Sequence, residues 1–172
     1  MNGAIFYTTR YGSTAQYAQW ISEATGLAAY DVRDTDQSPD GFDFLVLGSP
    51  VIYHRLPLNR WLRANRAAIA AKPVVLFTVS GAPAGRKLDG WIAASLPPDL
   101  IARMHHVALR GRQNPRELTY FDRMMLIIGS LINRDRTAAS EELHGFDFMD
   151  KATIAPAVVR IKALQAEQAA PA

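Results

Sequence analysis

Residues 3–26 read GAIFYTTRYGSTAQYAQWISEATG and carry the strongest structural signal in the chain. Residues 3–8 form a short apolar run rich in β-formers, which is typical of a buried parallel strand. A loop of hydroxyl side chains follows, and residues 14–25 then place apolar side chains at helical spacing up to a stop at Gly26. The stretch predicts a strand, a polar loop and a helix in direct succession.

The same alternation of strands and helices continues along the chain. Further strands are predicted at residues 27–32, 42–47, 73–79 and 104–109, and further helices at residues 56–71, 88–96 and 150–168. Alternating strands and helices form right-handed βαβ units, in which a parallel sheet lies between layers of helices. We therefore predict an α/β fold, with ligands bound at the carboxyl ends of the strands.

Residues 110–145 separate the last predicted strand from the last helix by more than a usual connection, so they are predicted to be an insertion. Residues 103–136 hold seven arginines against three acidic residues. This basic segment suggests an anionic partner, such as nucleic acid, phospholipid headgroups or a carboxylate-bearing small molecule. A solvated arginine-rich loop is the alternative.

The chain has 172 residues, of which 49% are hydrophobic and 20% charged, so we expect one domain over residues 1–172 with a disordered tail at 165–172. It has no cysteine, which excludes disulfides and thiolate metal sites and leaves redox chemistry to a cofactor. We predict no metal site and no nucleic-acid binding, because no motif for either occurs. The first residues lack a signal-peptide pattern, so the interpretation is a cytoplasmic protein.

Residues 8–14, TTRYGST, are suited to bind a phosphate. Gly12 lets the backbone approach a ligand closely, and the N–H groups of the following helix favour an anion. Neither G-x-x-x-x-G-K-[ST] nor G-x-G-x-x-G occurs, so a monophosphate fits better than a triphosphate or a dinucleotide. An ordinary turn with a helix N-cap has the same composition and stays open as an alternative.

This segment resembles the phosphate-binding signature of the flavodoxin-like FMN-binding family. The matching residues are Ile5, Phe6, Tyr7, Thr9, Gly12, Thr14, Ala18 and Ile21. The resemblance implies a flavodoxin-like, doubly wound, five-stranded parallel sheet of order 2-1-3-4-5, with helices on both faces and a long insertion after or within the fifth strand. It also implies that noncovalently bound FMN places its phosphate against Thr9, Arg10, Tyr11, Gly12, Ser13 and Thr14.

The resemblance further implies that two later loops flank the isoalloxazine ring of FMN. The second loop contributes Ser49, Pro50, Val51, Ile52, Tyr53 and His54, and the third contributes Val79, Ser80 and Gly81. Tyr53 and His54 are the candidates to stack on the ring, because aromatic faces suit a flat ligand. An ordinary loop aromatic and a solvated histidine are the alternatives. No side chain is identified as catalytic.

The insertion resembles that of the menaquinone-dependent protoporphyrinogen oxidases. Residues 109–132 read LRGRQNPRELTYFDRMMLIIGSLI, and the matching parts are residues 120–123, the two methionines after them and an apolar helix. The resemblance implies an FMN-dependent enzyme of heme biosynthesis that oxidises protoporphyrinogen IX to protoporphyrin IX and passes the electrons to a quinone. It implies substrate contacts by Tyr120 and Arg123. The family's tryptophan before the last helix is absent at residues 149–151.

Three roles are open for the apolar helix and its flanking arginines. Residues 116–136 suit peripheral contact with the cytoplasmic membrane face, and their arginines equally suit the propionates of a porphyrinogen. Alternatively, the helix packs on the sheet as part of the core through Met124, Leu126, Ile127 and Leu131. Two other functions also stay open: a flavodoxin-type electron-transfer protein or quinone reductase, and a flavin-free interaction module.

Overall fold

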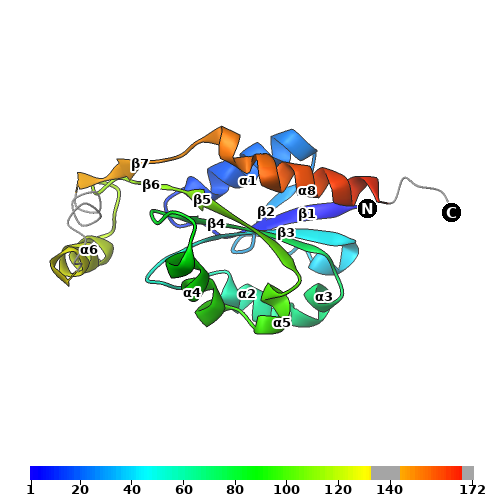
Figure 1. Ribbon diagram of the computed structural model, residues 1–172, viewed down its shortest axis with the longest axis horizontal. Helices are drawn as coiled ribbons and strands as arrows, with labels where there is room; N and C mark the ends of the chain where they lie inside the picture. Colours follow the sequence, from blue (N-terminus) through cyan, green and yellow to red (C-terminus); the bar gives the residue numbers. More distant parts are fainter. Residues whose placement is uncertain (133–143, 168–172) are drawn as a thin grey trace.

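The computed structural model describes residues 1–132 and 144–167. Its central sheet is parallel and has the strand order β2-β1-β3-β4-β5 (Figure 1). The strands are β1 (Gly3–Tyr7), β2 (Ala29–Asp31), β3 (Phe44–Pro50), β4 (Val74–Ser80) and β5 (Met104–Arg110). The predicted α/β fold and the predicted strand order are confirmed.

Helices cover both faces of the sheet (Figure 1). One face carries α1 (Ser13–Thr25) and α8 (Ala155–Ala166), and the other carries α2 (Asn59–Ala64), α3 (Arg66–Ala70), α4 (Arg86–Ser95) and α5 (Pro98–Ile101). Successive strand residues point to opposite faces, so Val75 packs toward α1 and α8 while Leu76 packs toward the other helices. The continuous apolar runs of the central strands thereby fill two cores. Short 3-10 helices, η1 (Pro39–Gly41) and η2 (Lys151–Ile154), precede β3 and α8.

The helix predicted at residues 56–71 is two helices, α2 and α3, because the chain leaves helical geometry at Asn65. Asn65 has φ −108° and ψ 20°, and its side-chain amide donates to the Trp61 carbonyl at 2.9 Å. Such a side-chain bond to the backbone competes with continuation of a helix. Pro98, predicted to stop the preceding helix, also starts α5, where proline at the first position costs no hydrogen bond.

Several predicted boundaries shift by a few residues. The strand predicted at residues 42–47 is β3, which continues to Pro50 because residues 48–50 pair in register with β4. The proline ends the strand, where a missing N–H is tolerated. The disordered tail predicted from residue 165 is wrong for residues 165–167, because Gln165 lies in α8 and donates to the Thr25 carbonyl at 3.1 Å. Residues 168–172 lie outside the described residues.

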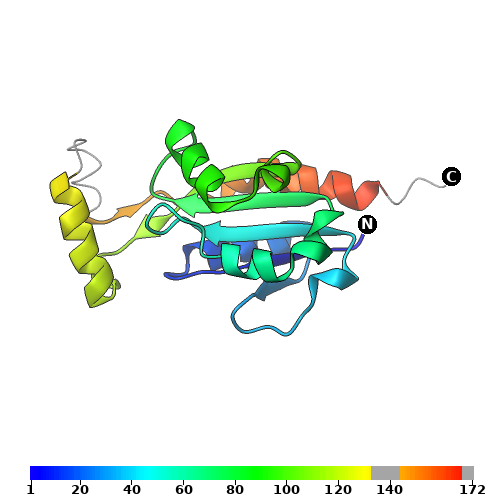
Figure 2. The ribbon, with the colours of Figure 1, turned by 90° about the horizontal axis from the view of Figure 1, so that it is seen from below.

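The insertion extends from the carboxyl end of the sheet. It contains β6 (Arg112–Gln113), which pairs antiparallel with β7 (Phe146–Asp147), and α6 (Tyr120–Ile132). Figure 2 shows α6 beyond the ends of the strands and not on a face of the sheet, so the core-helix alternative is wrong. The side chains of Leu126, Ile127 and Leu131 and the whole of residues 133–143 lie outside the described part. Within that part, no helix is both long and apolar enough to cross a membrane.

The close approach of β3 and β4 gives a first prediction. A Cβ on Gly48 would lie 2.3 Å from the ring of Phe77, which is fully buried and cannot move away. We expect Gly48→Ala to lower the free energy of unfolding by roughly 1–3 kcal/mol in urea denaturation. Gly90→Ala is the matched control, because Gly90 lies within α4 with no atom near its Cβ position, and it should gain up to about 1 kcal/mol. Equal stabilities of the two variants would contradict this packing.

Candidate functional site

The predicted site residues gather at the carboxyl edge of the sheet. Three loops leave this edge: the β1 loop (residues 8–12), the β3 loop (51–58) and the β4 loop (81–85). The β1 and β3 loops flank the point at which the strand order reverses, which is where open α/β sheets bind ligands. Of the other predicted residues, Ser13 and Thr14 begin α1, Ser49 and Pro50 end β3, and Val79 and Ser80 end β4.

The β1 loop has the backbone of an anion cradle. Gly12 adopts a left-handed φ of 86° at the N-cap of α1, and its N–H donates to Thr9 Oγ1 at 3.1 Å. No side chain caps α1, its first turn holds no acidic residue, and the Cβ position of Gly12 faces open space. The first N–H groups of α1 therefore meet the conditions for binding a phosphate.

Two residues predicted beside the phosphate are bonded to the insertion instead. The Ser13 hydroxyl donates to the Arg112 carbonyl at 3.4 Å and accepts from the Arg112 N–H at 3.3 Å. The Tyr11 hydroxyl donates to Asp122 Oδ2. Thr9 and the buried Thr14 are thus the predicted side chains left for a phosphate, together with the backbone N–H groups at the start of α1.

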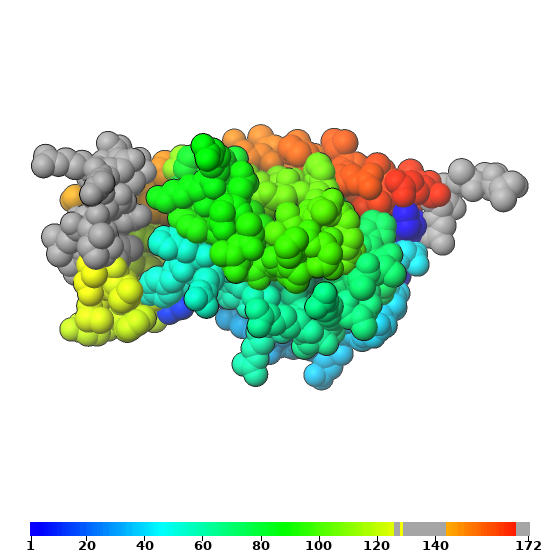
Figure 3. Space-filling view, turned by 60° about the horizontal axis from the view of Figure 1, so that its bottom comes forward, coloured from blue at the N-terminus to red at the C-terminus, as the bar shows by residue number. Residues whose placement is uncertain are grey.

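Asp122, in the first turn of α6, joins two of the loops. The residue is only 7% exposed, and its carboxylate accepts hydrogen bonds from the hydroxyls of Tyr11 and Tyr53. Arg10 Nη2 of the β1 loop lies 2.6 Å from the same carboxylate. The space-filling view shows α6 (yellow) against the β3 loop (cyan) (Figure 3). The insertion is therefore part of this edge of the molecule.

These contacts change the titration of the groups in the cluster. Burial raises the pKa of Asp122, but hydrogen bonds from Tyr11, Tyr53 and Thr119 and the charge of Arg10 outweigh burial, so the pKa lies below its ordinary value. Burial, followed by the hydrogen bond to Asp122 and its negative charge, raises the pKa of Tyr53 to about 12. Near neutral pH the cluster therefore holds an ionised carboxylate and a neutral Tyr53 phenol.

The β3 loop turns at Tyr53 and His54. Both have left-handed φ values, 50° and 62°, and they are closed by two hydrogen bonds between Ile52 and Arg55. This is the geometry of a two-residue hairpin turn, which non-glycine residues adopt only at a cost in free energy. The His54 ring stacks on Trp91 at 4.6 Å, while the Tyr53 ring meets Phe121 edge to face at 6.4 Å. The two predicted stacking residues therefore have different partners.

The backbone carbonyls of Val79, Ser80 and Gly81, which are predicted to lie at the flavin edge, already accept hydrogen bonds within the protein. The carbonyl of Val79 accepts from the Val51 N–H, and that of Ser80 accepts from the Gly111 N–H, both at 2.9 Å. The Gly81 carbonyl accepts from Arg110 Nη2 at 2.8 Å. The carbonyls of these three residues therefore already take part in contacts within the protein.

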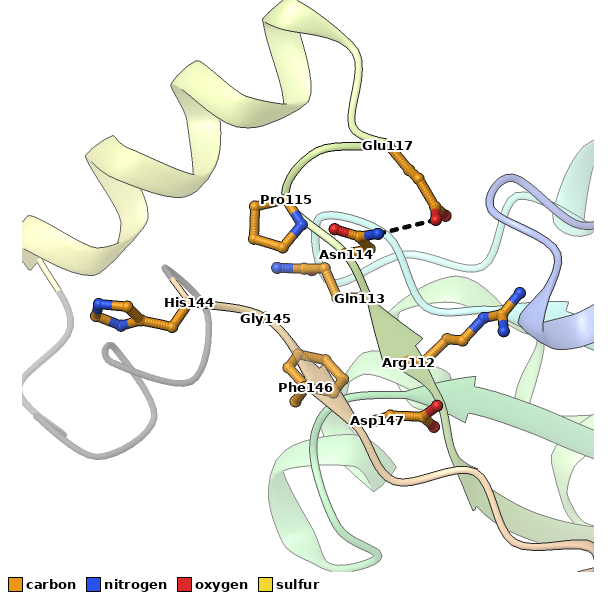
Figure 4. Close-up of a pocket in the computed structure, with 9 residues that line it drawn as sticks. All are labelled: Arg112, Gln113, Asn114, Pro115, Glu117, His144, Gly145, Phe146 and Asp147. Atoms are coloured by element: carbon orange, nitrogen blue, oxygen red, sulfur yellow. Dashed lines mark hydrogen bonds between the residues drawn. The ribbon is translucent and has the colours of Figure 1, made fainter.

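A pocket of about 440 Å³ opens beside the paired strands β6 and β7 (Figure 4). It is lined by Arg112, Gln113, Asn114, Pro115, Glu117, His144, Gly145, Phe146 and Asp147. Arg112 reaches from it toward the start of α1, and it also lines a second pocket together with Gly12, Ala15 and Gln16. Arg112 therefore adds a positive charge beside the anion cradle.

The chain matches the flavodoxin domain model over residues 4–139, which is most of its length. It belongs to the flavodoxin domain family. No curated protein matches it. Asp122 and Arg112 are not among the site residues predicted from the sequence, although the pattern T-x-x-D at residues 119–122 marks a helix start.

Solved structures similar to this flavodoxin-family chain include several flavoproteins. One is a flavoprotein in complex with FMN from Lactobacillus acidophilus, with 12% identity and a TM-score of 0.45, covering 63% of this chain and 91% of that one. Another is a flavodoxin, WrbA-like protein from Agrobacterium tumefaciens, with 16% identity and a TM-score of 0.45, covering 92% of this chain and 98% of that one.

Arg110 gives a prediction about how the insertion is attached. Its guanidinium donates to the Gly81 carbonyl through Nε and Nη2 and lies 3.5 Å from the centre of the Phe148 ring. Lysine keeps the charge but loses the planar fork, so Arg110→Lys should lower the free energy of unfolding by roughly 1–2 kcal/mol. Arg116→Lys, at an exposed site of the same insertion, is the control. Denaturation curves that coincide for both variants would show that the fork does not matter.

Proposed function

We propose that this chain binds FMN and acts as a redox protein. One observation carries the proposal: the β1 loop enters the uncapped N-terminus of α1 at the point where the strand order reverses. That geometry suits a single phosphate group, and it occurs in a chain of the flavodoxin domain family. Thr9, Thr14 and the N–H groups at the start of α1 would hold the phosphate, with Arg112 as a nearby positive charge, while Arg10 is paired with Asp122.

The chain's own residues also suit the flat ring of FMN. Tyr53 is 47% exposed at the same edge, and its ring is held beside Phe121. An exposed aromatic face of this kind can cover one side of a planar ligand and exclude water from it. When bound, FMN would supply the electron-transfer chemistry that a chain without cysteine lacks.

We further propose an enzymatic role, the oxidation of protoporphyrinogen IX with a quinone as acceptor. Its support is the sequence resemblance of the insertion, together with the contact of that insertion with the cofactor loops through Asp122. Arg123 follows Asp122 and is exposed, and Tyr120 is 86% exposed. Both side chains are available to a carboxylate-bearing substrate beside the proposed flavin. Peripheral membrane contact by residues 116–136 stays a prediction, and Arg134 and Arg136 lie outside the described residues.

The second candidate function is electron transfer to a protein partner, in the manner of a flavodoxin. Membership of the flavodoxin domain family favours it. A carrier would accept and release electrons without turning over a porphyrinogen. Turnover by the purified holoprotein, measured as the appearance of porphyrin fluorescence with a quinone present, therefore separates the two candidates.

Thr14 tests the phosphate site. We expect Thr14→Ala to weaken FMN binding by roughly 1–3 kcal/mol, because the charged phosphate loses a hydrogen bond from the Thr14 hydroxyl. Quenching of flavin fluorescence during titration of the apoprotein measures this affinity. Riboflavin, which has no phosphate, is the matched control and should bind the variant and the unaltered protein equally. A protein that binds neither flavin would support the flavin-free interaction module.

Arg123 tests the enzymatic role. Arg123→Lys keeps the positive charge but loses bidentate pairing with a carboxylate, so kcat/KM for protoporphyrinogen should fall by about tenfold to a hundredfold. FMN affinity should not change, since Arg123 lies outside the contacts of the cofactor loops. Arg116→Lys, which makes the same replacement at another exposed arginine of the insertion, is the control. If Arg123→Lys turns over porphyrinogen at the full rate, propionate recognition by Arg123 is wrong.

A further inference from the structure

We propose that Asp122 is a positioning residue, which holds the β1 and β3 loops in the arrangement that binds both ends of FMN. This inference rests on the proposed function. Oδ2 of Asp122 accepts a hydrogen bond from the Tyr11 hydroxyl and pairs with the Arg10 guanidinium, both of the β1 loop. Oδ1 accepts a hydrogen bond from the Tyr53 hydroxyl of the β3 loop. One carboxylate therefore joins the loop at the proposed phosphate site to the loop at the proposed ring site.

The local structure of α6 explains why Asp122 can reach both loops. Thr119 caps the helix, and its Oγ1 accepts from the Asp122 N–H at 3.2 Å. In an ordinary capping box the acidic side chain three residues on would accept the N–H of the capping residue. Here the Thr119 N–H donates to the Tyr11 hydroxyl at 3.3 Å instead. Tyr11 thus completes the helix cap, and the Asp122 carboxylate is released to bind the tyrosines.

The β3 loop needs such an anchor. Tyr53 stands in a left-handed conformation that costs free energy, and about half of its surface is exposed. The charge-assisted hydrogen bond from its hydroxyl to Asp122 offsets that cost and fixes the direction of the ring. Phe121, next to Asp122, supports the same ring edge to face.

An ionised carboxylate is needed for this role, because three donors converge on it. Asparagine has nearly the same shape but is uncharged and offers one acceptor oxygen, so it cannot accept from all three donors, and its amide nitrogen could only donate to a tyrosine hydroxyl. Asp122→Asn therefore removes the charge that draws the two loops together, while changing the volume little. Tyr53→Phe removes one arm of the junction and keeps the aromatic ring.

The first experiment titrates the apoprotein with FMN and with riboflavin. We expect Tyr53→Phe to weaken the binding of both flavins by roughly tenfold, because it loses the anchor of the ring loop, and Asp122→Asn to weaken the binding of FMN at least as much, because it loses the anchor of both loops. The double variant should be no weaker than Asp122→Asn alone, since the two changes remove one shared contact. Asp36→Asn, in the exposed loop before η1, is the matched control and should bind both flavins normally. Additive losses in the double variant would overturn the shared contact.

The second experiment needs no flavin. Absorbance titration of the tyrosines in the apoprotein should show the Tyr53 phenol ionising near pH 12 in the unaltered protein, and its pKa should fall in Asp122→Asn, because the hydrogen bond and charge of Asp122 are lost while burial remains. The shift reports the hydrogen bond between Tyr53 and Asp122, and the flavin titration reports whether that bond positions the ring loop. An unchanged tyrosine titration in Asp122→Asn would overturn the contact on which the inference rests, and unchanged flavin affinity would overturn the positioning role.

The two experiments also separate this inference from the proposed function. If the unaltered protein binds no flavin, the proposed function and the cofactor role of Asp122 both fall. If the unaltered protein and Asp122→Asn bind FMN with equal affinity, only the role of Asp122 falls. Tyr53→Phe keeps the test available should Asp122→Asn fail to fold.

Discussion

The central strands β3 and β4 are buried on both faces, and the rest of the molecule depends on this constraint. Side chains along them are mostly apolar in both directions, so helices have to cover both faces, as they do in parallel sheets. Polar groups are left for the strand ends. Ser49 and Ser80, with their hydroxyls bonded to nearby carbonyls, mark where the apolar interior gives way to a polar edge. The functional edge of this fold follows from how its core is built.

At that edge, the nearly buried carboxylate of Asp122 connects loops that the strands themselves do not connect. A buried charge is costly unless several donors surround it, and Asp122 has hydroxyls from two loops and the guanidinium of Arg10. These donors come from separate loops, so the carboxylate has all its hydrogen-bond partners only when both loops are in place. The insertion is attached to the sheet domain through this cluster, through Ser13 and through the Arg110 stack on Phe148.

The periodicity of the sequence was enough to predict the strand, loop and helix at residues 3–26, because those features depend on neighbours in the chain. The break at Asn65 was missed, since a polar side chain turning back on its own helix leaves the apolar spacing unchanged. The turn at Tyr53 and His54 was missed because no glycine marks its left-handed geometry. The partners of Asp122 were out of reach for another reason: Tyr11 is 111 residues away in sequence, and only the fold brings the two together.

The arginines of the basic segment have different roles in the structure, although the sequence analysis considers them together as one source of positive charge. Arg110 is committed to the Gly81 carbonyl and the Phe148 ring. Arg112 reaches the start of α1, where it adds to the field of the helix N-terminus. Arg123 is exposed on α6, beside the junction at Asp122. A count of arginines therefore overstates the charge available to an outside partner, because one holds the fold and another faces the anion cradle. An anionic substrate or surface would meet Arg123 and its exposed neighbours, and recognition there would depend on the placement of individual guanidinium groups more than on net charge.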